Sequence, residues 1–237
     1  LVEAAWEGIL KDIQKKCPDI DQKKLVHIPN GFDPEDYPKS DALDKKKFTV
    51  AYTGSMYGKR NPQTFLRAVE ELVSEKKVSE KRITLKFIGR FGSEVQSMFE
   101  KTPLRRAVET VSYLPHAQSI AELLRAHALL LVVDEAKESG EIVPGKVFEY
   151  VGAKRPIIAL APEGAIAQLI KETKTGYVAH NQDIAAIKAA FLECYRNFLY
   201  HRKTFRPNRG AVKRYERREA TRQLARLLDL ASSPKSP

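Results

Sequence analysis

From Phe48 onward the sequence alternates short apolar runs with amphipathic segments, and this alternation constrains the fold more than any other feature. Runs such as LLLVV (129–133) and PIIAL (156–160) have no polar face, which is typical of strands that helices cover on both sides. Strands that alternate with helices favour right-handed crossovers and a mostly parallel sheet. The sequence therefore predicts a doubly wound α/β domain. We expect strands at 48–53, 83–88, 108–111, 128–133, 156–160 and 176–178, and helices at 63–76, 93–101, 118–125, 146–152, 165–171 and 184–198.

Two further helices are expected outside this domain. An amphipathic pattern predicts a first helix over 2–16, which Pro18 ends, and a similar pattern predicts a last helix at about 212–230. Because Leu1 stands where an initiator Met is expected, we expect a fragment or a trimmed chain. The predicted organisation is an N-terminal helix with a linker, the α/β domain, and a basic C-terminal helix with a tail, at 1–44, 45–200 and 201–237.

The net charge of +11 is unevenly distributed. Residues 201–237 carry 11 Lys/Arg and 3 acidic residues, whereas the first 200 residues carry 30 and 27. Nucleic-acid binding is not expected, because the basic excess is confined to the tail and the sheet carries no aromatic stacking motif. A basic amphipathic helix in the tail fits an anionic membrane surface. It also fits an intramolecular helix whose apolar side packs on the body and whose arginines are solvated, because the same face is expected to bridge the two domains.

The cysteines and the apolar runs bear on the compartment. Cys17 and Cys194 lie far apart and lack the spacing of metal ligands. No apolar run is long enough to span a bilayer, and the N-terminus lacks the pattern of a signal peptide. These features indicate a cytoplasmic protein, with peripheral contact to the inner membrane face as the one membrane association that the basic tail suggests.

In open parallel sheets, ligands bind at the carboxyl ends of the strands. The loop after the first predicted strand reads TGSMYGKRNP, and it offers a flexible backbone at Gly54, a small donor at Ser55 and two cations at Lys59 and Arg60. Such a loop before a helix fits a pyrophosphate site, although a solvated basic loop has the same composition. Neither GxGxxG nor GxxxxGK[ST] is present, so the dinucleotide fingerprint and the P-loop do not apply.

Two more loops add candidates. Arg90, in IGRFGS after the second strand, could flank a base or a phosphate, or belong to a plain turn. Leu114 lies in the loop after the third strand, whose backbone suits a base edge, although Leu there is also typical of a core.

The loop after the fourth strand carries two glutamates that are eight residues apart, Glu141 and Glu149. A carboxylate near a helix N-terminus that accepts paired hydroxyl groups is how proteins bind a ribose. Surface glutamates recur at this interval by chance, so the spacing alone is weak. The turn between them can direct backbone N–H groups at a phosphate, and it consists of Pro144, Gly145, Lys146 and Val147.

Taken in order, these motifs resemble the C-terminal, donor-binding domain of a retaining glycosyltransferase of the family 4 type, which has the GT-B fold. The resemblance covers about residues 20–230 and implies a Rossmann-like domain that forms the C-terminal half of that fold. Its carriers are HIPNGFD (27–33), AYTGSMYGKRNPQTFLRAV (51–69), IGR (88–90), SYLPHAQSIAELLRAHALLL (112–131), GEIVPGKVFEYVGAKRPIIAL (140–160) and TGYV (175–178).

The resemblance assigns roles by position. Glu141 matches the first glutamate of the family's Glu-x7-Glu element, which faces the donor sugar and is the catalytic candidate. Glu149 matches the second, which binds ribose hydroxyls. Arg60 falls where a Lys commonly contacts the diphosphate. Ser55 falls where many members have an Arg, so the sequence departs from the family there, and Lys59 or Arg90 would compensate.

The 144–147 turn matches the segment whose backbone meets the distal phosphate. The usual Gly-Phe-Gly after the first glutamate reads Ile-Val-Pro here, which weakens the assignment of Glu141 more than that of Glu149. The family implies transfer of a hexosyl group from a nucleotide sugar with retention, without a cofactor beyond the donor and without a protein-bound metal. The Asp19-Ile20-Asp21 pattern of metal-dependent transferases lies in the linker and is read as chance.

Whole members of the fold carry an N-terminal acceptor-binding domain, which is expected to be missing from this chain. The isolated donor half is therefore expected to bind a nucleotide sugar, whereas catalysis needs donor and acceptor face to face. Two alternatives share the architecture. One is a nucleotide-sugar epimerase, which would form an epimer without an acceptor, and the other is a non-catalytic nucleotide-sugar-binding module.

Overall fold

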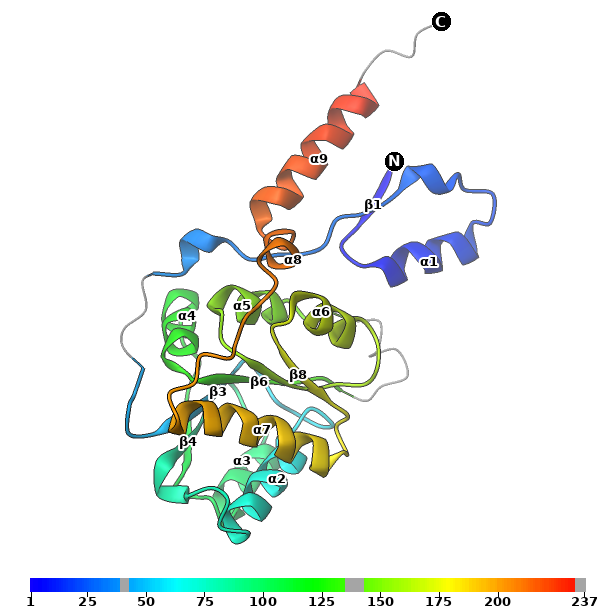
Figure 1. Cartoon of the computed structure of the whole chain (residues 1–237). Coiled ribbons are helices and arrows are strands. Elements are labelled where there is room, and N and C mark those ends of the chain that lie inside the picture. The colour runs from blue at the N-terminus through cyan, green and yellow to red at the C-terminus, as the bar shows by residue number, and fades with distance from the viewer. Residues whose placement is uncertain (39–42, 135–142, 233–237) are drawn as a thin grey trace, which may run out of the picture.

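A single parallel sheet forms the centre of the protein (Figure 1). The computed structural model describes residues 1–38, 43–134 and 143–232. The strands lie in the order β5-β4-β3-β6-β7-β8, and every neighbouring pair is parallel. The doubly wound, Rossmann-like α/β fold predicted from the sequence is confirmed. The strands are β3 (Phe48–Thr53), β4 (Ile83–Ile88), β5 (Val108–Val111), β6 (Ala128–Val132), β7 (Ile157–Leu160) and β8 (Gly176–Ala179).

Helices cover both faces of this sheet, and successive strand residues enter opposite cores. Val50 and Tyr52 face one core, whereas Ala51 between them faces the other, as the alternation of side chains along a strand requires. The first core is closed by α2 (Gln63–Ser74), α3 (Ser93–Lys101) and α7 (Ile184–Leu199). The second is closed by α4 (His116–Arg125), α5 (Lys146–Ala153) and α6 (Ala165–Thr173).

The chain reverses its direction of winding at β3. It runs outward from β3 to β4 and β5, and then returns to place β6 on the other side of β3. β3 pairs with β4 over all six residues from Phe48 to Thr53. It pairs with β6 only through Val50 and Ala51, so the two strands part before their carboxyl ends. Such a switch point is where open α/β sheets bind ligands.

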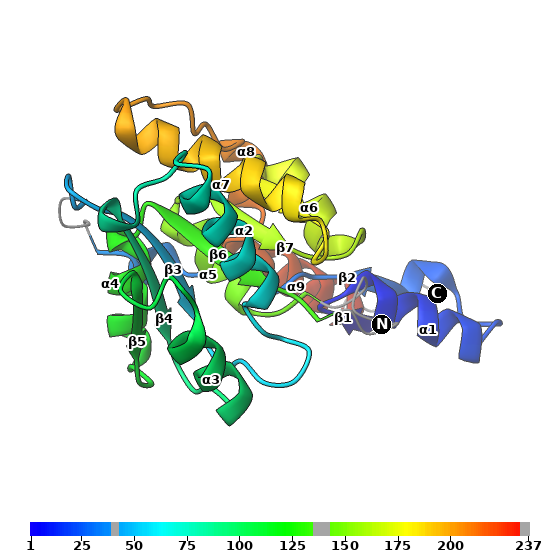
Figure 2. The same ribbon diagram turned by 90° about the horizontal axis from the view of Figure 1, so that it is seen from below.

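The N-terminal segment forms a small unit beside the main sheet, and both ribbon views place it apart from the sheet (Figures 1 and 2). α1 (Glu7–Lys16) packs on a parallel pair of short strands, β1 (Val2–Ala4) and β2 (Leu25–His27). The predicted helix over 2–16 was therefore wrong at its start. Residues 2–4 pair with 25–27, which gives their backbone groups partners that a single sequence window cannot reveal. The short 3₁₀ turns are η1 (Gln22–Lys24), η2 (Pro34–Asp36) and η3 (Glu80–Arg82).

The predicted last helix over 212–230 is in fact two helices, α8 (Arg209–Lys213) and α9 (Arg217–Ser232). The linker interrupts it, because Phe32 N–H donates to Tyr215 O at 2.9 Å and Arg217 N–H donates to Phe32 O at 2.9 Å. Backbone groups that bond to the linker cannot continue the helical pattern at this point. The three-segment division at 1–44, 45–200 and 201–237 stays a prediction.

Candidate functional site

The loops after β3 and β4 meet backbone to backbone above the sheet. Gly54 has φ +112° and donates its N–H to Ile88 O at 2.8 Å. Gly89 has φ +144°, and a Cβ there would lie 2.1 Å from Gly54 O. Only glycine fits both constraints at these positions. The Gly54 singled out from the sequence therefore shapes the start of the loop, with its backbone close to the neighbouring strand.

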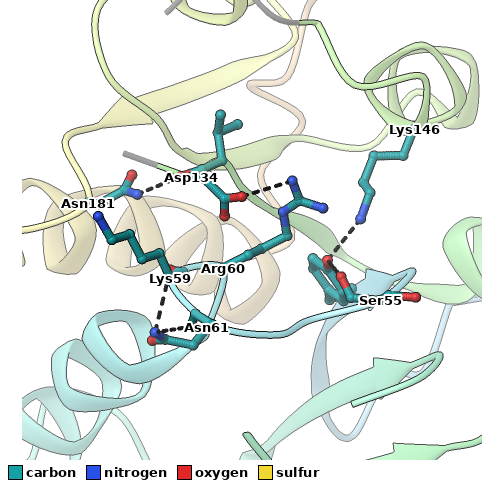
Figure 3. Close-up of polar contacts among 10 residues, drawn as sticks. Ser55, Lys59, Arg60, Asn61, Asp134, Lys146 and Asn181 are labelled. Atoms are coloured by element: carbon teal, nitrogen blue, oxygen red, sulfur yellow. Dashed lines mark hydrogen bonds and ion pairs between the residues drawn. The ribbon is translucent and has the colours of Figure 1, made fainter. Parts of the chain in front are cut away.

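Lys146, at the start of α5, reaches the end of β3 (Figure 3). Its Nζ donates to Tyr52 Oη at 2.8 Å and to Thr53 O at 2.9 Å, and it lies 4.3 Å from the centroid of the Tyr52 ring. Burial, and after it the nearby Arg60, lower the pKa of Lys146 to about 8, although the carboxylates of Glu149 and Asp134 oppose this change. The sequence interpretation gave this residue only a backbone role in the turn.

Arg60 lies across the switch point from the end of β6. Its Nη2 is 3.2 Å from Asp134 Oδ2, and Figure 3 shows the two side chains pointing toward each other. Asp134 Oδ1 is buried without a hydrogen-bond partner in the described structure. The same holds for Oδ1 of Asn181, whose Nδ2 donates to Val133 O at 2.6 Å. Unpaired buried acceptors cost free energy, so this edge of the site favours a ligand with hydroxyl or other donor groups, or ordered water.

Glu149 lies on α5 one turn beyond Lys146. Its Oε1 is 3.4 Å from His116 Nε2, at the start of α4, and its backbone oxygen accepts a hydrogen bond from Tyr37 Oη at 3.0 Å. Burial raises the pKa of the Glu149 carboxyl, and the neighbouring side chains of His116, Lys146 and Arg217 oppose this rise. The carboxylate lines a pocket of about 540 Å³, which is within the size range of ligand pockets. The linker segment 28–31 and the start of α9 form the opposite walls of this pocket.

The remaining residues of the 144–147 turn lie around the start of α5. Gly145 is exposed and lines the same pocket as Glu149, whereas Pro144 is half-buried. Val147 is fully buried in the core, so its side chain cannot contact a ligand. Its N–H donates to Pro144 O at 3.0 Å.

The other predicted residues lie on three different parts of the same edge. The backbone oxygen of Ser55 accepts a hydrogen bond from Tyr52 Oη at 2.9 Å, so this residue belongs to the same network as Lys146. Lys59 lines a smaller pocket of about 270 Å³ at the start of α2, together with Asn181. Leu114 is half-buried in the loop between β5 and α4.

Arg90 lies apart from this network. Its guanidinium carbon is 5.5 Å from the centroid of the exposed Tyr113 ring, and both residues line a pocket of about 580 Å³ beside β5 and α3. The structure thus brings Ser55, Arg60 and Lys146 together at the switch point, whereas Arg90 faces a neighbouring pocket.

Glu141, the predicted catalytic residue, lies outside the described residues. Five residues of the site were missed in the sequence, although Tyr113–His116 was noted as a loop. Asp134 directly follows the fourth predicted strand, which is a usable signal, because polar residues at carboxyl ends of strands are ligand candidates. The others have partners that are distant in the sequence and depend on tertiary packing, and they are Tyr52, His116, Tyr150 and Asn181.

The described parts of the chain contain neither a cluster of metal ligands nor a helix that could cross a bilayer. No group of three or more His, Cys, Asp or Glu residues within 1–38, 43–134 and 143–232 is arranged to hold a metal ion. Asp21 of the Asp-x-Asp pattern accepts a hydrogen bond from Lys23 N–H at 3.0 Å and caps a 3₁₀ turn. Among the described helices, none combines the length and the apolar character that crossing a bilayer requires.

A sequence profile described as Glycosyl transferases group 1 matches residues 47–197, which extend from β3 into α7 and include the whole of the network around Arg60 and Lys146. The chain belongs to this glycosyltransferase family. No curated protein matches the sequence.

Solved glycosyltransferase structures share the fold. Sucrose-phosphate synthase from Thermosynechococcus elongatus superposes with a TM-score of 0.71 at 17% identity, over 98% of this chain and 59% of that one. HepE from Anabaena in complex with UDP gives 0.70 at 14% identity, over 97% and 63%. A TarM variant from S. aureus, in complex with fondaparinux, α-GlcNAc-glycerol and UDP, gives 0.68 at 17% identity, over 98% and 44%. The chain thus spans 44% to 63% of the length of these proteins. Their likeness supports the assignment of the fold to the Rossmann-like half of a GT-B glycosyltransferase.

Proposed function

We propose that this chain binds a nucleoside diphosphate sugar at the switch point between β3 and β6, and that it is the donor half of a retaining glycosyltransferase of the family 4 type. One observation carries the proposal. Two cations, Arg60 and Lys146, come from separate elements to the same strand ends, and the carboxylate of Glu149 lies one helical turn away on α5. Cations beside a carboxylate suit a diphosphate joined to a ribose. Structural neighbours such as HepE hold UDP, which supports this choice of ligand.

The proposed chemistry follows from the charges. When the bond between the sugar and the diphosphate breaks, the leaving nucleoside diphosphate gains negative charge. Arg60, Lys146 and the positive end of the α5 dipole would stabilise that charge, so no divalent metal would be needed. Glu149 would accept hydrogen bonds from the ribose hydroxyls. The prediction that Glu141 faces the donor sugar rests on the family motif and stays a prediction.

The acceptor would bind on a second domain outside this sequence. The structural neighbours are between about 1.6 and 2.3 times as long as the part that this chain covers, which supports a further domain in the whole protein. Transfer requires both substrates to be held in contact. We therefore expect the donor half to bind nucleotide sugar and to transfer a hexosyl group only together with its acceptor domain.

We further propose that α9 is a partner surface. None of its residues is buried, and Leu224, Leu228 and Leu230 are 42%, 56% and 73% exposed. Its first turn bonds to the linker through Arg217 and Arg218. The rest projects away from the sheet in Figure 1. Its arginines and leucines would suit an anionic bilayer surface, and the acceptor domain is the alternative partner.

The decisive experiment for the donor site is calorimetry of the chain with a panel of nucleoside diphosphates and their sugars, with and without EDTA. We expect one nucleoside diphosphate to bind in either condition, and the bare nucleoside to bind far more weakly. No binding of any member, or binding only with a divalent metal, would contradict the proposal. Formation of an epimer of the bound sugar without any acceptor would favour an epimerase instead.

The partner surface is tested with acidic liposomes. The membrane proposal predicts pelleting of the chain that decreases with salt, since each basic residue near an anionic surface contributes about 1 kcal/mol. A chain truncated near Pro207 should no longer pellet. Equal pelleting of both chains, or of neither, would leave the acceptor domain as the partner of α9.

A further inference from the structure

Two side chains of α5 bind the two backbone groups of Thr53, the last residue of β3. Lys146 Nζ donates to Thr53 O at 2.9 Å, and Thr53 N–H donates to Tyr150 Oη at 2.9 Å. Residues 146 and 150 are four apart and therefore lie on the same face of α5. At Thr53, side chains of α5 therefore bind the backbone groups that β6 would bond if its pairing with β3 continued.

The sheet geometry explains why this contact is needed. Thr49 O accepts a hydrogen bond from His127 N–H, and Ala51 is the last residue of β3 paired with β6. Because bonding groups alternate sides along a strand, Thr53 is the next residue whose N–H and C=O face β6. Thr53 is 4% exposed, so these groups would lack partners without α5. Lys146 and Tyr150 therefore allow the strands to part where Arg60 meets Asp134.

The ammonium group of Lys146 is surrounded by both signs of charge. Arg60 approaches from the loop after β3, Asp134 from the end of β6, and Glu149 from α5 itself, while the Tyr52 ring lies against it. Within the part of the chain that the structure describes, these four groups are the charged and titratable neighbours of Lys146. Two cations face two carboxylates here, so an added diphosphate would make the local charge negative and favour the protonated form of Lys146.

We propose that Lys146 is a positioning residue of the donor site. It fixes α5 to the end of β3, and its positive charge and the diphosphate of the bound donor stabilise each other. This inference rests on the proposed donor site. It adds that binding of the donor and protonation of Lys146 are linked. If the bound ligand favours the protonated lysine, the complex must take up protons from the solution when it forms.

The direction of the pH dependence follows from the contacts. Burial and Arg60 lower the pKa of Lys146 to about 8 in the free protein, so part of the population is neutral above that pH. A bound diphosphate raises this pKa, and affinity therefore falls as the pH rises from about 8 upward. The last pKa of the terminal phosphate of a nucleoside diphosphate is about 6, so this group does not make the affinity depend on pH above about 8.

The test is calorimetry of UDP binding between pH 7 and 9, repeated in two buffers with different ionisation enthalpies. For the wild-type chain we expect uptake of up to about one proton per UDP near pH 8.5, and affinity that falls toward pH 9. Lys146→Met should lose the proton uptake and bind about tenfold more weakly at pH 7, with little further change up to pH 9. Lys171→Met is the matched control, because Lys171 is an exposed lysine on α6, and it should behave as the wild type.

Two further variants separate charge from hydrogen bonding. Lys146→Gln keeps a donor without the charge, so it should also lose the proton uptake. Tyr150→Phe removes the other contact to Thr53 and keeps the charge, so it should retain the uptake. If Lys146→Met does not fold, Lys146→Gln and the wild-type measurement decide the question.

The outcomes distinguish this inference from the proposed function. Wild-type chain that binds UDP without proton uptake, or Lys146 variants that take up as many protons as the wild type, would overturn the role of Lys146 and leave the donor site standing. Failure of the wild type to bind any nucleoside diphosphate would overturn both.

Discussion

The hydroxyl group of Tyr150 offers a quantitative test of how the switch point is stabilised. It is the acceptor for Thr53 N–H at 2.9 Å, and the two residues are 0% and 4% exposed. Tyr150→Phe removes the acceptor and leaves a buried N–H without a partner. Such a group costs about 1–3 kcal/mol, so we expect the free energy of unfolding to fall by about 2 kcal/mol. For a chain of this length, that loss corresponds to a decrease in Tm of about 4–8 °C.

Tyr195→Phe is the matched control. Tyr195 is buried to the same degree, at 2% exposed, but its hydroxyl accepts only a long bond of 3.4 Å from Ser79 N–H. The same chemical change should therefore cost less there. Urea denaturation of the wild type and both variants, followed by circular dichroism, gives the comparison. If Tyr150→Phe costs no more than Tyr195→Phe, then Thr53 N–H finds another partner and α5 is not what satisfies the end of β3.

Three further predictions concern the donor site and the opposite end of the sheet. Glu149→Ala should weaken UDP binding about tenfold or more, since a charged hydrogen-bonding partner is lost, whereas the exposed Glu94→Ala should not; equal calorimetric affinities would refute the ribose role. Arg60→Ala should weaken UDP binding far more than uridine binding, and more strongly at low salt. Arg67→Ala removes an exposed arginine on α2 and should change neither affinity. Burial lowers the pKa of His127 to about 4, below its unfolded value near 6.5. The free energy of unfolding should therefore fall by about 2 kcal/mol as the pH decreases from 6.5 toward 4. His127→Gln should flatten this dependence in urea titrations.

The positions of the strands along the chain could be predicted because their sequence pattern is local. Both faces of each central strand are buried, so the runs at 129–133 and 156–160 are apolar throughout and are bounded by turn residues. Right-handed crossovers then leave few ways to arrange the strands. The errors lie where a distant segment decides the structure. Residues 2–4 form a strand because 25–27 pair with them, and the last helix breaks where Phe32 bonds to its backbone.

The candidate site was predictable only to the extent that loops at the carboxyl ends of strands are known to meet. That rule placed Arg60 and Glu149 at one edge of the sheet. It could not place Asp134 beside Arg60, because these residues are 74 positions apart and their contact depends on β6 lying next to β3. His116 became the partner of Glu149 for the same reason, since α4 and α5 pack together on one face.

Lys146 was predicted as a site residue for its backbone, but in the structure its side chain makes the contacts at the site. In the sequence it stands in a turn before a helix, where a lysine is usually solvated. Its side chain is instead drawn inward, because Thr53 O has no strand partner and Tyr52 presents both a hydroxyl and a ring. Whether a strand lacks a partner depends on how far its neighbour runs beside it, and β6 parts from β3 after Ala51. The unsatisfied backbone at the switch point therefore accounts for both a buried cation at the site and the position of α5, which carries the proposed ribose carboxylate.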